Sequence, residues 1–336
     1  MNTFGRLFRI SILGESHGEC VGILVDGCPA GLLLSEGDFL HDLERRKGKK
    51  TGTTSRKEDD VPLIKSGVFR GKTTGTPILI LFQNKDTDST VYEKIKDTPR
   101  PGHADFTAFI KYGGFNDYRG GGYFSGRLTA GLVAAGVIAK KIIHPVKVEA
   151  KLTEAGGSKD IEEAVRSAIM NMDSIGGIVA CKVEGLPAGL GEPFFDSVES
   201  LISHIVFSIP GIKGIEFGAG FKSAKMTGSA CNDIIINMEG ETKTNNAGGI
   251  NGGITNGNEV FFKVAVKPTA SIGKTQSTVD LKTGKPVMML DIGGRHDVCI
   301  ALRVPVIVEA VTASVIADLM LMGQKVSKTV RLMGGP

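Results

Sequence analysis

Runs of apolar residues rich in β-branched and aromatic side chains recur along the chain and predict β-strands. In VFFKVAV, at residues 260–266, the apolar run follows the turn residues Asn256, Gly257 and Asn258. Its length and its boundary are those of a strand. The same pattern predicts strands at residues 21–25, 78–82, 234–238, 260–266 and 287–292.

Apolar residues spaced three and four apart predict helices elsewhere. Residues 35–47 open with Ser35 and carry Asp38 three positions later, which is a helix start signal. Residues 127–143 and 308–322 are apolar almost throughout and predict buried helices. Two further amphipathic helices are predicted at residues 160–172 and 197–207.

This mixture of elements predicts a single α+β domain over residues 1–336, with helices covered by sheets. The apolar stretches at residues 77–82 and 304–308 fall short of the about 18 residues that a membrane span needs. The N-terminus lacks the order of a secretory signal, because Arg6 and Arg9 interrupt its apolar run. We therefore expect a cytoplasmic protein without a membrane-spanning helix.

An internal echo suggests that the domain has two similar halves, at about residues 1–150 and 175–330. VDGCPAGL at residues 25–32 matches VEGLPAGL at residues 183–190, and a weaker echo pairs residues 66–71 with 252–257. Duplication places a ligand cleft between the halves. The alternative is convergence, because V-x-G-x-P is a common turn sequence.

The amino-acid composition excludes some classes of function. The net charge of +4 over 336 residues is too small for a dedicated nucleic-acid binder. The five cysteines include no C-x-x-C pair, which argues against disulfides and a zinc site, so no metal is expected. Glycine accounts for 46 residues, well above the average usage of about 7%. Such an excess favours tight turns and close approach of the backbone to a ligand.

Three histidines, His17, His103 and His296, lie in short Gly- or Pro-bounded segments beside strong charges. Proton-transfer groups are often presented on such loops. The alternative for each is a hydrogen bond within a turn.

Arginine next to glycine in a loop suits the two-point binding of carboxylate or phosphate. The segment RGGGYFSGR at residues 119–127 joins this chemistry to the start of a predicted helix, where free N–H groups and the helix dipole attract anions. Residues 267–271, KPTAS, offer a cation and two hydroxyl groups at the end of a predicted strand. They suit a phosphate or the edge of a flavin, or form an ordinary strand exit.

These segments together resemble the chorismate synthase family, in order along almost the whole chain. The matching motifs are GESHG, VDGCPAG, SGVFRGKTTGTPI, RPGHAD, LPAGLGEP, NNAGGINGGI, KPTASI and RHDVC. The resemblance implies a β-α-β sandwich of two pseudo-symmetric halves, with helices between antiparallel sheets, and a homotetramer. It also implies a lyase of the shikimate pathway that uses reduced FMN to convert 5-enolpyruvylshikimate-3-phosphate to chorismate and phosphate, on the route to the aromatic amino acids.

The resemblance also assigns roles to residues. His17 would protonate the departing phosphate, His103 would stabilise the reduced flavin, and Asp297 would accept the proton that leaves C6 of the substrate through the flavin. Arg46, Arg100 and Arg127 would bind substrate anions, and Arg46 also matches a position assigned to reduced pyridine nucleotide. The matching flavin positions are Ser125, Gly252, Lys267, Pro268, Thr269, Ala270, Ser271 and Arg295.

The chain departs from the family pattern after its three glycines, where Tyr123 and Phe124 replace an arginine and a serine. A relative that binds flavin or anions without catalysis is therefore the alternative function. Nucleic-acid binding through residues 45–50 is a third, which the small net charge disfavours. The sequence leaves open whether NADPH reduces the flavin on this protein.

Overall fold

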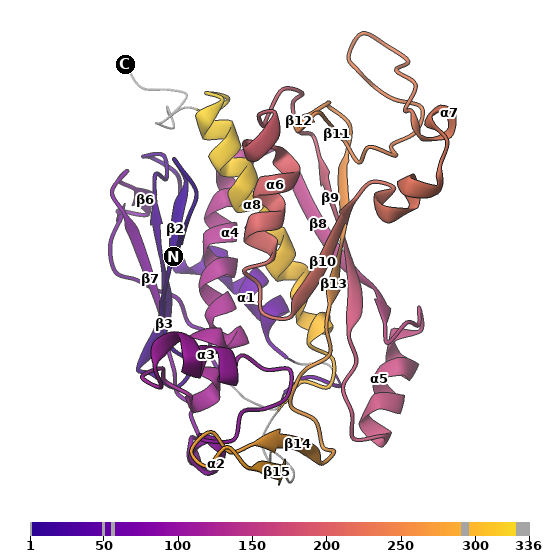
Figure 1. Ribbon diagram of the computed structural model, residues 1–336. Helices are drawn as coiled ribbons and strands as arrows, with labels where there is room; N and C mark the ends of the chain where they lie inside the picture. Colours follow the sequence, from indigo (N-terminus) through magenta and orange to yellow (C-terminus); the bar gives the residue numbers. More distant parts are fainter. Residues whose placement is uncertain (1, 49–50, 55–57, 290–295, 327–336) are drawn as a thin grey trace.

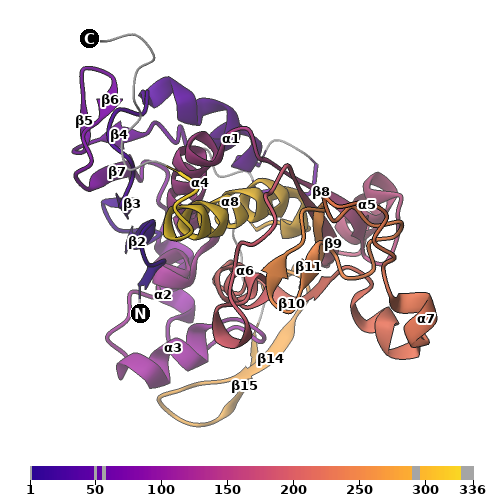
Figure 2. The ribbon, with the colours of Figure 1, turned by 90° about the horizontal axis from the view of Figure 1, so that it is seen from above.

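Two antiparallel sheets enclose a layer of helices in the computed structural model (Figure 1). The structure describes all residues except 1, 49–50, 55–57, 290–295 and 327–336. Figure 2 shows the layers edge-on, with the helices α4 and α8 between the sheets. The predicted α+β fold, a β-α-β sandwich, is confirmed.

The first sheet has the strand order β1-β2-β3-β7-β4, and every neighbouring pair is antiparallel. Its inward side chains are apolar: Ile23, Ile80 and Phe82 have no exposed surface. The alternation of buried and partly buried positions along β7 is what a sheet covered on one face requires. The strands are β1 (Thr3–Phe4), β2 (Arg9–Gly14), β3 (Cys20–Asp26), β7 (Ile78–Gln83) and β4 (Leu63–Ile64).

The second sheet has the order β10-β13-β9-β8 and is also antiparallel. Along β13, alternate residues from Val260 to Val266 are buried and face the helical layer. The strands are β8 (Lys147–Ala155), β9 (Gly177–Glu184), β10 (Ile212–Phe217) and β13 (Val260–Val266).

The helical layer is built on α4 (Thr129–Ile143) and α8 (Val304–Met322). They approach closely at Gly136, where a Cβ atom would lie 2.3 Å from the Cα of Ala310. The other helices of this layer are α1 (Leu40–Arg46), preceded by the 3₁₀ turn Glu36–Phe39, and α6 (Val198–Val206).

In the described part of the chain, one helical segment, Ile300–Met322, is long and apolar enough to span a membrane, and 94% of its apolar window is buried inside the protein. The prediction that apolar stretches are too short missed it, because Glu309 and Asp318 interrupt an otherwise apolar helix. Since this segment packs against α4 and α6 and against the strands β8 and β9, it is the core helix of the molecule (Figure 2).

Corresponding turns in the two halves share their hydrogen bonds. Leu32 N–H donates to Thr73 Oγ1 at 2.9 Å, and Thr73 donates to Pro29 O at 2.6 Å. In the second half, Leu190 N–H donates to Thr255 Oγ1 at 2.9 Å. The hydroxyl of Thr255 in turn donates to Pro187 O at 2.8 Å. We propose that the halves descend from one repeated unit, which this correspondence supports.

The weaker internal repeat, predicted between residues 66–71 and 252–257, aligns differently in the structure. Thr73 corresponds to Thr255, so Arg70 and Gly71 match Gly252 and Gly253. All four have positive φ angles, of 50°, 73°, 59° and 89°. The equivalent hairpins are β5 (Val68–Phe69) with β6 (Lys72–Thr73), and β11 (Ile250–Asn251) with β12 (Ile254–Thr255).

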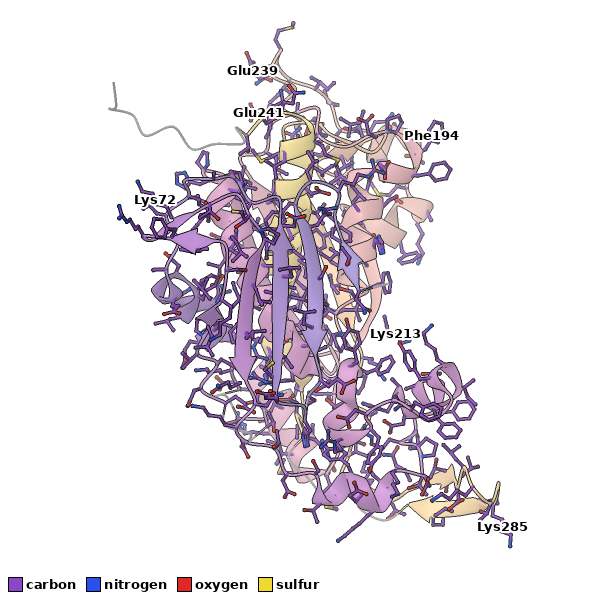
Figure 3. The ribbon with its side chains drawn as sticks, turned by 90° about the vertical axis from the view of Figure 1, so that its left-hand side faces the viewer. Lys72, Phe194, Lys213, Glu239, Glu241 and Lys285 are labelled. Carbon is purple, nitrogen blue, oxygen red and sulfur yellow. The ribbon has the colours of Figure 1, made fainter. Side chains whose placement is uncertain are left out.

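Smaller elements gather at one end of the sandwich. α2 (Thr90–Ile95), α3 (Asp105–Tyr112) and the hairpin β14 (Gln276–Val279) with β15 (Pro286–Met289) lie there, at the bottom of Figure 1. Lys285 of this hairpin lies at the opposite end from Glu239 and Glu241 (Figure 3). The remaining helices are α5 (Ile161–Met170) and α7 (Gly228–Cys231).

Most predicted elements are present, with one clear error. Residues 234–238 form no strand: Ile235 makes an isolated bridge to Thr242, and the side chains of Ile234, Ile235 and Ile236 are more than half exposed. Their β-branched side chains favour a strand, but neither sheet lies alongside to pair with them. β15 covers the start of the predicted strand 287–292, whose end lies outside the described residues.

Candidate active site

A cavity of about 1340 Å³ opens at the end of the sandwich where α2 and α3 lie. Its walls come from the end of α1, the loops before α3 and α4, the start of β10, the exit of β13 and the start of α8. It brings together most of the predicted site residues: His17, Arg46, Arg100, His103, Ser125, Arg127, Lys267, Pro268, Thr269, Ala270, Ser271 and Asp297.

The glycine-rich loop 119–122 lies between the two predicted catalytic histidines. A Cβ atom on Gly120 would lie 2.5 Å from His17 Nε2, and one on Gly121 would lie 3.5 Å from His103 Nε2. Both glycines have positive φ, 59° and 79°, a region that side chains disfavour. Consecutive glycines therefore bring two histidines, distant in sequence, to one wall.

Two neighbouring side chains orient the ring of His17. Its Nδ1 lies 2.9 Å from Ser89 Oγ, and its ring packs edge-on against Tyr92 at 5.3 Å between centroids. These contacts come from α2 and the residue before it. The ring is thus fixed while it lines the cavity.

A carboxylate holds His103 and Arg100 together. Asp105 accepts hydrogen bonds from Arg100 Nε at 2.7 Å and from Arg100 Nη2 at 2.9 Å, and its Oδ1 lies 2.6 Å from His103 Nδ1. Burial by itself raises the pKa of Asp105, but the hydrogen bonds from Arg100 and His103 outweigh it and hold the pKa well below its usual value. Asp105 is therefore ionised beside the imidazole.

Two further arginines of the cavity share a second carboxylate. Arg46 binds one oxygen of Asp60 and Arg127 binds the other. Arg127 also donates to Asn84 Oδ1 at 2.9 Å and to Gln83 O at 3.3 Å. The exposed fractions of Arg46 and Arg127 are only 5% and 6%. Buried, oriented guanidinium groups of this kind suit the recognition of anions.

Asp297 is held at both carboxylate oxygens. Thr54 N–H donates to Oδ1 at 2.8 Å, and Arg303 Nη1 donates to Oδ2 at 3.1 Å. Arg303 also donates to Arg46 O at 3.0 Å, which links the two arginine groups. Burial lowers the pKa of Arg303, and the carboxylate of Asp297 opposes this effect.

The exit of β13 forms another wall of the cavity. Lys267 N–H pairs with Gly211 O at 2.8 Å, while Lys267 Nζ reaches Gly102 O. Partial burial and the charge of Lys213 lower the pKa of Lys267. Thr269 Oγ1 is buried without a hydrogen-bond partner among the described residues. A hydroxyl in this state is available to a ligand.

The arginines of this cavity can therefore bind a polyanionic small molecule, and its histidines and carboxylates can transfer protons. Among the described residues, no group of three or more His, Cys, Asp or Glu side chains is arranged to hold a metal ion.

Known proteins are similar to this chain over almost its whole length. The sequence profile of a family described as chorismate synthase matches residues 8–321. The chorismate synthase of Chitinophaga pinensis is 62% identical, over 97% of this chain and 98% of that protein. That of Pyrococcus abyssi is 46% identical, over 94% of this chain and 96% of the relative. The chain belongs to the chorismate synthase family.

A solved structure supports the same assignment. The crystal structure of a chorismate synthase superimposes with a TM-score of 0.72 at 25% identity, covering 95% of this chain and 93% of that one. As a member of the chorismate synthase family, the protein is an enzyme, a carbon–oxygen lyase. The family match favours this function over the non-catalytic alternative.

Two predicted residues are not among those brought to the cavity. Gly252 lies in the β11–β12 hairpin, which Figure 1 places at the opposite end of the molecule from α2 and β14. It is not one of the described residues that line the cavity. Arg295 lies outside the described residues.

The structure adds residues that the sequence did not single out. Asp60, Asn84, Ser89 and Arg303 contact predicted site residues from other segments. Asp105 lies inside the RPGHAD motif but was assigned no role. The sequence feature that comes closest to indicating these residues is a charged residue next to a motif. Such a feature does not show which distant residue the side chain contacts.

Proposed function

We propose that the protein eliminates phosphate from 5-enolpyruvylshikimate-3-phosphate to form chorismate, with reduced FMN as its cofactor. The observation that carries the proposal is the meeting of His17 and His103 at consecutive glycines of one arginine-lined cavity. Proton donors and guanidinium groups are what the departure of a phosphate requires.

The residues at the exit of β13 fit FMN. Thr269 Oγ1 is buried without a protein partner among the described residues, and Lys267 and Ser271 line the same wall. The cavity, at about 1340 Å³, exceeds the roughly 300–1,000 Å³ of most single-ligand pockets. Residues 267–271 and Ser125 would hold the flavin. When bound, reduced FMN supplies electron density to the allylic carbon as phosphate leaves.

The side chains of the chain itself supply the acid–base steps. His17, with Nδ1 fixed on Ser89, protonates the departing phosphate. His103, with its ring fixed by Asp105, would stabilise the reduced flavin. Asp297 is the final acceptor of the proton removed from C6 of the substrate, and Arg303 and Thr54 fix the direction of its carboxylate.

Arg46, Arg100 and Arg127 bind the anionic groups of the substrate. Each is paired with a buried or partly buried carboxylate. Such pairing holds a guanidinium in place and leaves its other donors for a ligand.

An anaerobic assay tests this function. Enzyme, dithionite-reduced FMN and 5-enolpyruvylshikimate-3-phosphate are mixed, and the absorbance of chorismate is followed. Product should form only with the reduced flavin, and absence of product with every component present would reject the function. Repeating the assay with NADPH in place of dithionite tests whether the protein reduces its own flavin.

Substitution of the two histidines tests their roles. His17→Ala and His103→Ala should each lower kcat by roughly 10²-fold or more, the scale of general acid–base catalysis. His144→Ala is the control, because His144 is exposed at the end of α4. Wild-type rates in either active-site variant would contradict the assignment.

We also propose that the protein is a cytoplasmic homotetramer acting on a small molecule, without a nucleic-acid or membrane partner. The many exposed apolar side chains, among them Phe194, Phe195 and Met238, support association with further copies. The central position of the apolar helix α8 supports a protein that works in water.

A further inference from the structure

Asp60 lies between two arginines of the cavity wall and binds each with a different oxygen. Arg46 Nη2 donates to Oδ2, and Arg127 Nη1 donates to Oδ1. The carboxylate has no exposed surface. Its backbone has a φ of 50°, in the left-handed region that aspartate adopts more readily than most residues.

Without this carboxylate, two guanidinium groups would face each other away from water. Burial lowers the pKa of Arg127, the charge of Arg46 lowers it further, and Asp60 opposes both effects. Burial by itself raises the pKa of Asp60, but the two arginines outweigh it and keep the carboxylate ionised. Asp60 therefore holds the cations Arg46 and Arg127 close together, and the three side chains carry one net positive charge.

The arginines keep capacity for a ligand. Arg127 is fixed by Asn84 and by Gln83 O as well as by Asp60. Among the described residues, the guanidinium of Arg46 is hydrogen-bonded to Asp60 alone, and its Nε is buried without a partner. Both side chains line the cavity. Asp60 therefore determines the direction of Arg46 and its distance from Arg127.

We propose that Asp60 is a positioning residue that joins Arg46 and Arg127 into one two-armed clamp for a phosphate or carboxylate group of the substrate. This inference rests on the proposed function. It assigns to Asp60 no contact with the substrate, only control over the two groups that make contact.

The test compares Asp60→Asn with a matched control, Asp42→Asn. Asparagine keeps the shape and tolerates the left-handed backbone, but it cannot accept from both arginines. Asp42 is also a buried carboxylate between two cations, Arg45 at 3.2 Å and Lys140 at 2.7 Å. It lies on α1, as Arg46 does, but is not among the described residues that line the cavity.

In the anaerobic assay, Asp60→Asn should raise the KM for the phosphorylated substrate about tenfold or more and change kcat less, the signature of lost ground-state binding. Asp42→Asn should lower thermal stability and leave KM unchanged. A KM within twofold of wild type in Asp60→Asn, or an equal rise in both variants, would overturn the proposal. A lower KM would also overturn it, because Asp60 would then compete with the substrate.

A second variant tests the proposal if Asp60→Asn folds poorly. Asp60→Gly fits the backbone φ and leaves space for formate between the arginines. Added formate should bring its raised KM back toward the wild-type value. If formate only competes with the substrate, as in the wild type, the clamp is wrong.

Binding of inorganic phosphate separates this inference from the function itself. Phosphate should raise the melting temperature of the wild type and of Asp42→Asn, because a ligand of the folded state stabilises it. The apparent affinity should be about tenfold weaker in Asp60→Asn. If the wild type forms no chorismate but this difference holds, the function fails and the clamp stands; equal shifts in all three proteins reject the clamp.

Discussion

The site leaves no room for a side chain at Gly120. Its φ is 59°, and an added Cβ would lie 2.3 Å from His17 Cδ2 and 2.8 Å from Ser16 Oγ. Real Cβ atoms do not approach other atoms so closely, so a side chain here must displace the imidazole. The glycine is needed for space as well as for backbone conformation.

Gly120→Ala should therefore lower kcat by about tenfold or more, because His17 is moved from its position on Ser89. Gly71→Ala is the matched control: its φ is 73° and no atom lies within 4 Å of the added Cβ. Both variants carry a backbone strain of about 1–2 kcal/mol, so the control measures the effect of that strain without the collision. Steady-state rates that fall equally in both would show that the collision with His17 is irrelevant.

Site residues that carry their own local signal could be predicted, and their partners could not. His17, His103 and Arg127 stand beside glycines in loops, a pattern visible in a short window. Asp60 contacts Arg127 across 67 positions, and Asp297 accepts from Thr54 across 243. Many carboxylates in the sequence could have filled those places. Only the fold selects among them.

At the scale of elements, a local pattern again does not identify distant partners, and this is why one predicted strand is wrong and the others are correct. Residues 260–266 have the apolar composition of a strand, and β9 and β10 lie on either side to pair with them. Residues 234–238 have a similar composition but lie outside both sheets. The five predicted helices are present, because a helix forms its hydrogen bonds internally and Ser35, Asp160 and Ser197 mark three of the starts. The short helices α2, α3 and α7 were not predicted.

A buried ion cluster connects α1, α4 and α8 with the edge strand β8. Glu309 accepts from Arg45 through two bonds of 2.7 Å, from Lys140 at 3.0 Å and from Ala150 N–H at 3.0 Å. It is 4% exposed. Burial by itself raises the pKa of Glu309, but Arg45 and Lys140 outweigh it and hold the pKa below its usual value.

Glu309→Gln should lower the free energy of unfolding by about 3 kcal/mol at pH 7, since removal of one partner leaves buried charges unpaired. The folded pKa is depressed, so the contribution of Glu309 is complete above the unfolded value of about 4.3 and is lost as the pH falls through the folded value. Urea unfolding should thus show a smaller difference between variant and wild type at pH 3.5 than at pH 7. Glu149→Gln, whose side chain is 62% exposed, should differ little at either pH; a difference for Glu309→Gln that grows in acid would refute the pairing.

At the scale of the whole molecule, the equivalent turns predict equivalent energetics in the two halves. Thr73 and Thr255 are each 3% exposed, and each hydroxyl satisfies one leucine N–H and one proline carbonyl. Thr73→Val and Thr255→Val should each cost about 1–3 kcal/mol, because two buried backbone groups lose their partner. The double variant should show the sum, since the sites lie in different halves. Denaturant titrations test this against Thr76→Val, an exposed control; a large cost in one half only would contradict the equivalence.

The two halves differ most in the connection that leads into their second central strand. In the first half, β4 reaches β7 through residues 65–77, whereas β10 reaches β13 through residues 218–259. This longer segment, which contains α7, extends from the body (Figure 1) and exposes Ile234, Ile235, Ile236 and Met238. Apolar side chains exposed on an insertion that belongs to neither large sheet are typical of contacts with another protein.

We expect this insertion to contribute to the proposed homotetramer. The double substitution Ile234→Ser and Ile236→Ser should lower the mass in solution, measured by light scattering after gel filtration, while the circular dichroism spectrum stays unchanged because neither side chain is part of the core. The control replaces Leu33 and Phe69, each 65% exposed on the other half, with serine and should keep the wild-type mass. A monomeric wild type would reject the tetramer, and an unchanged mass in the isoleucine variant would place its contacts elsewhere.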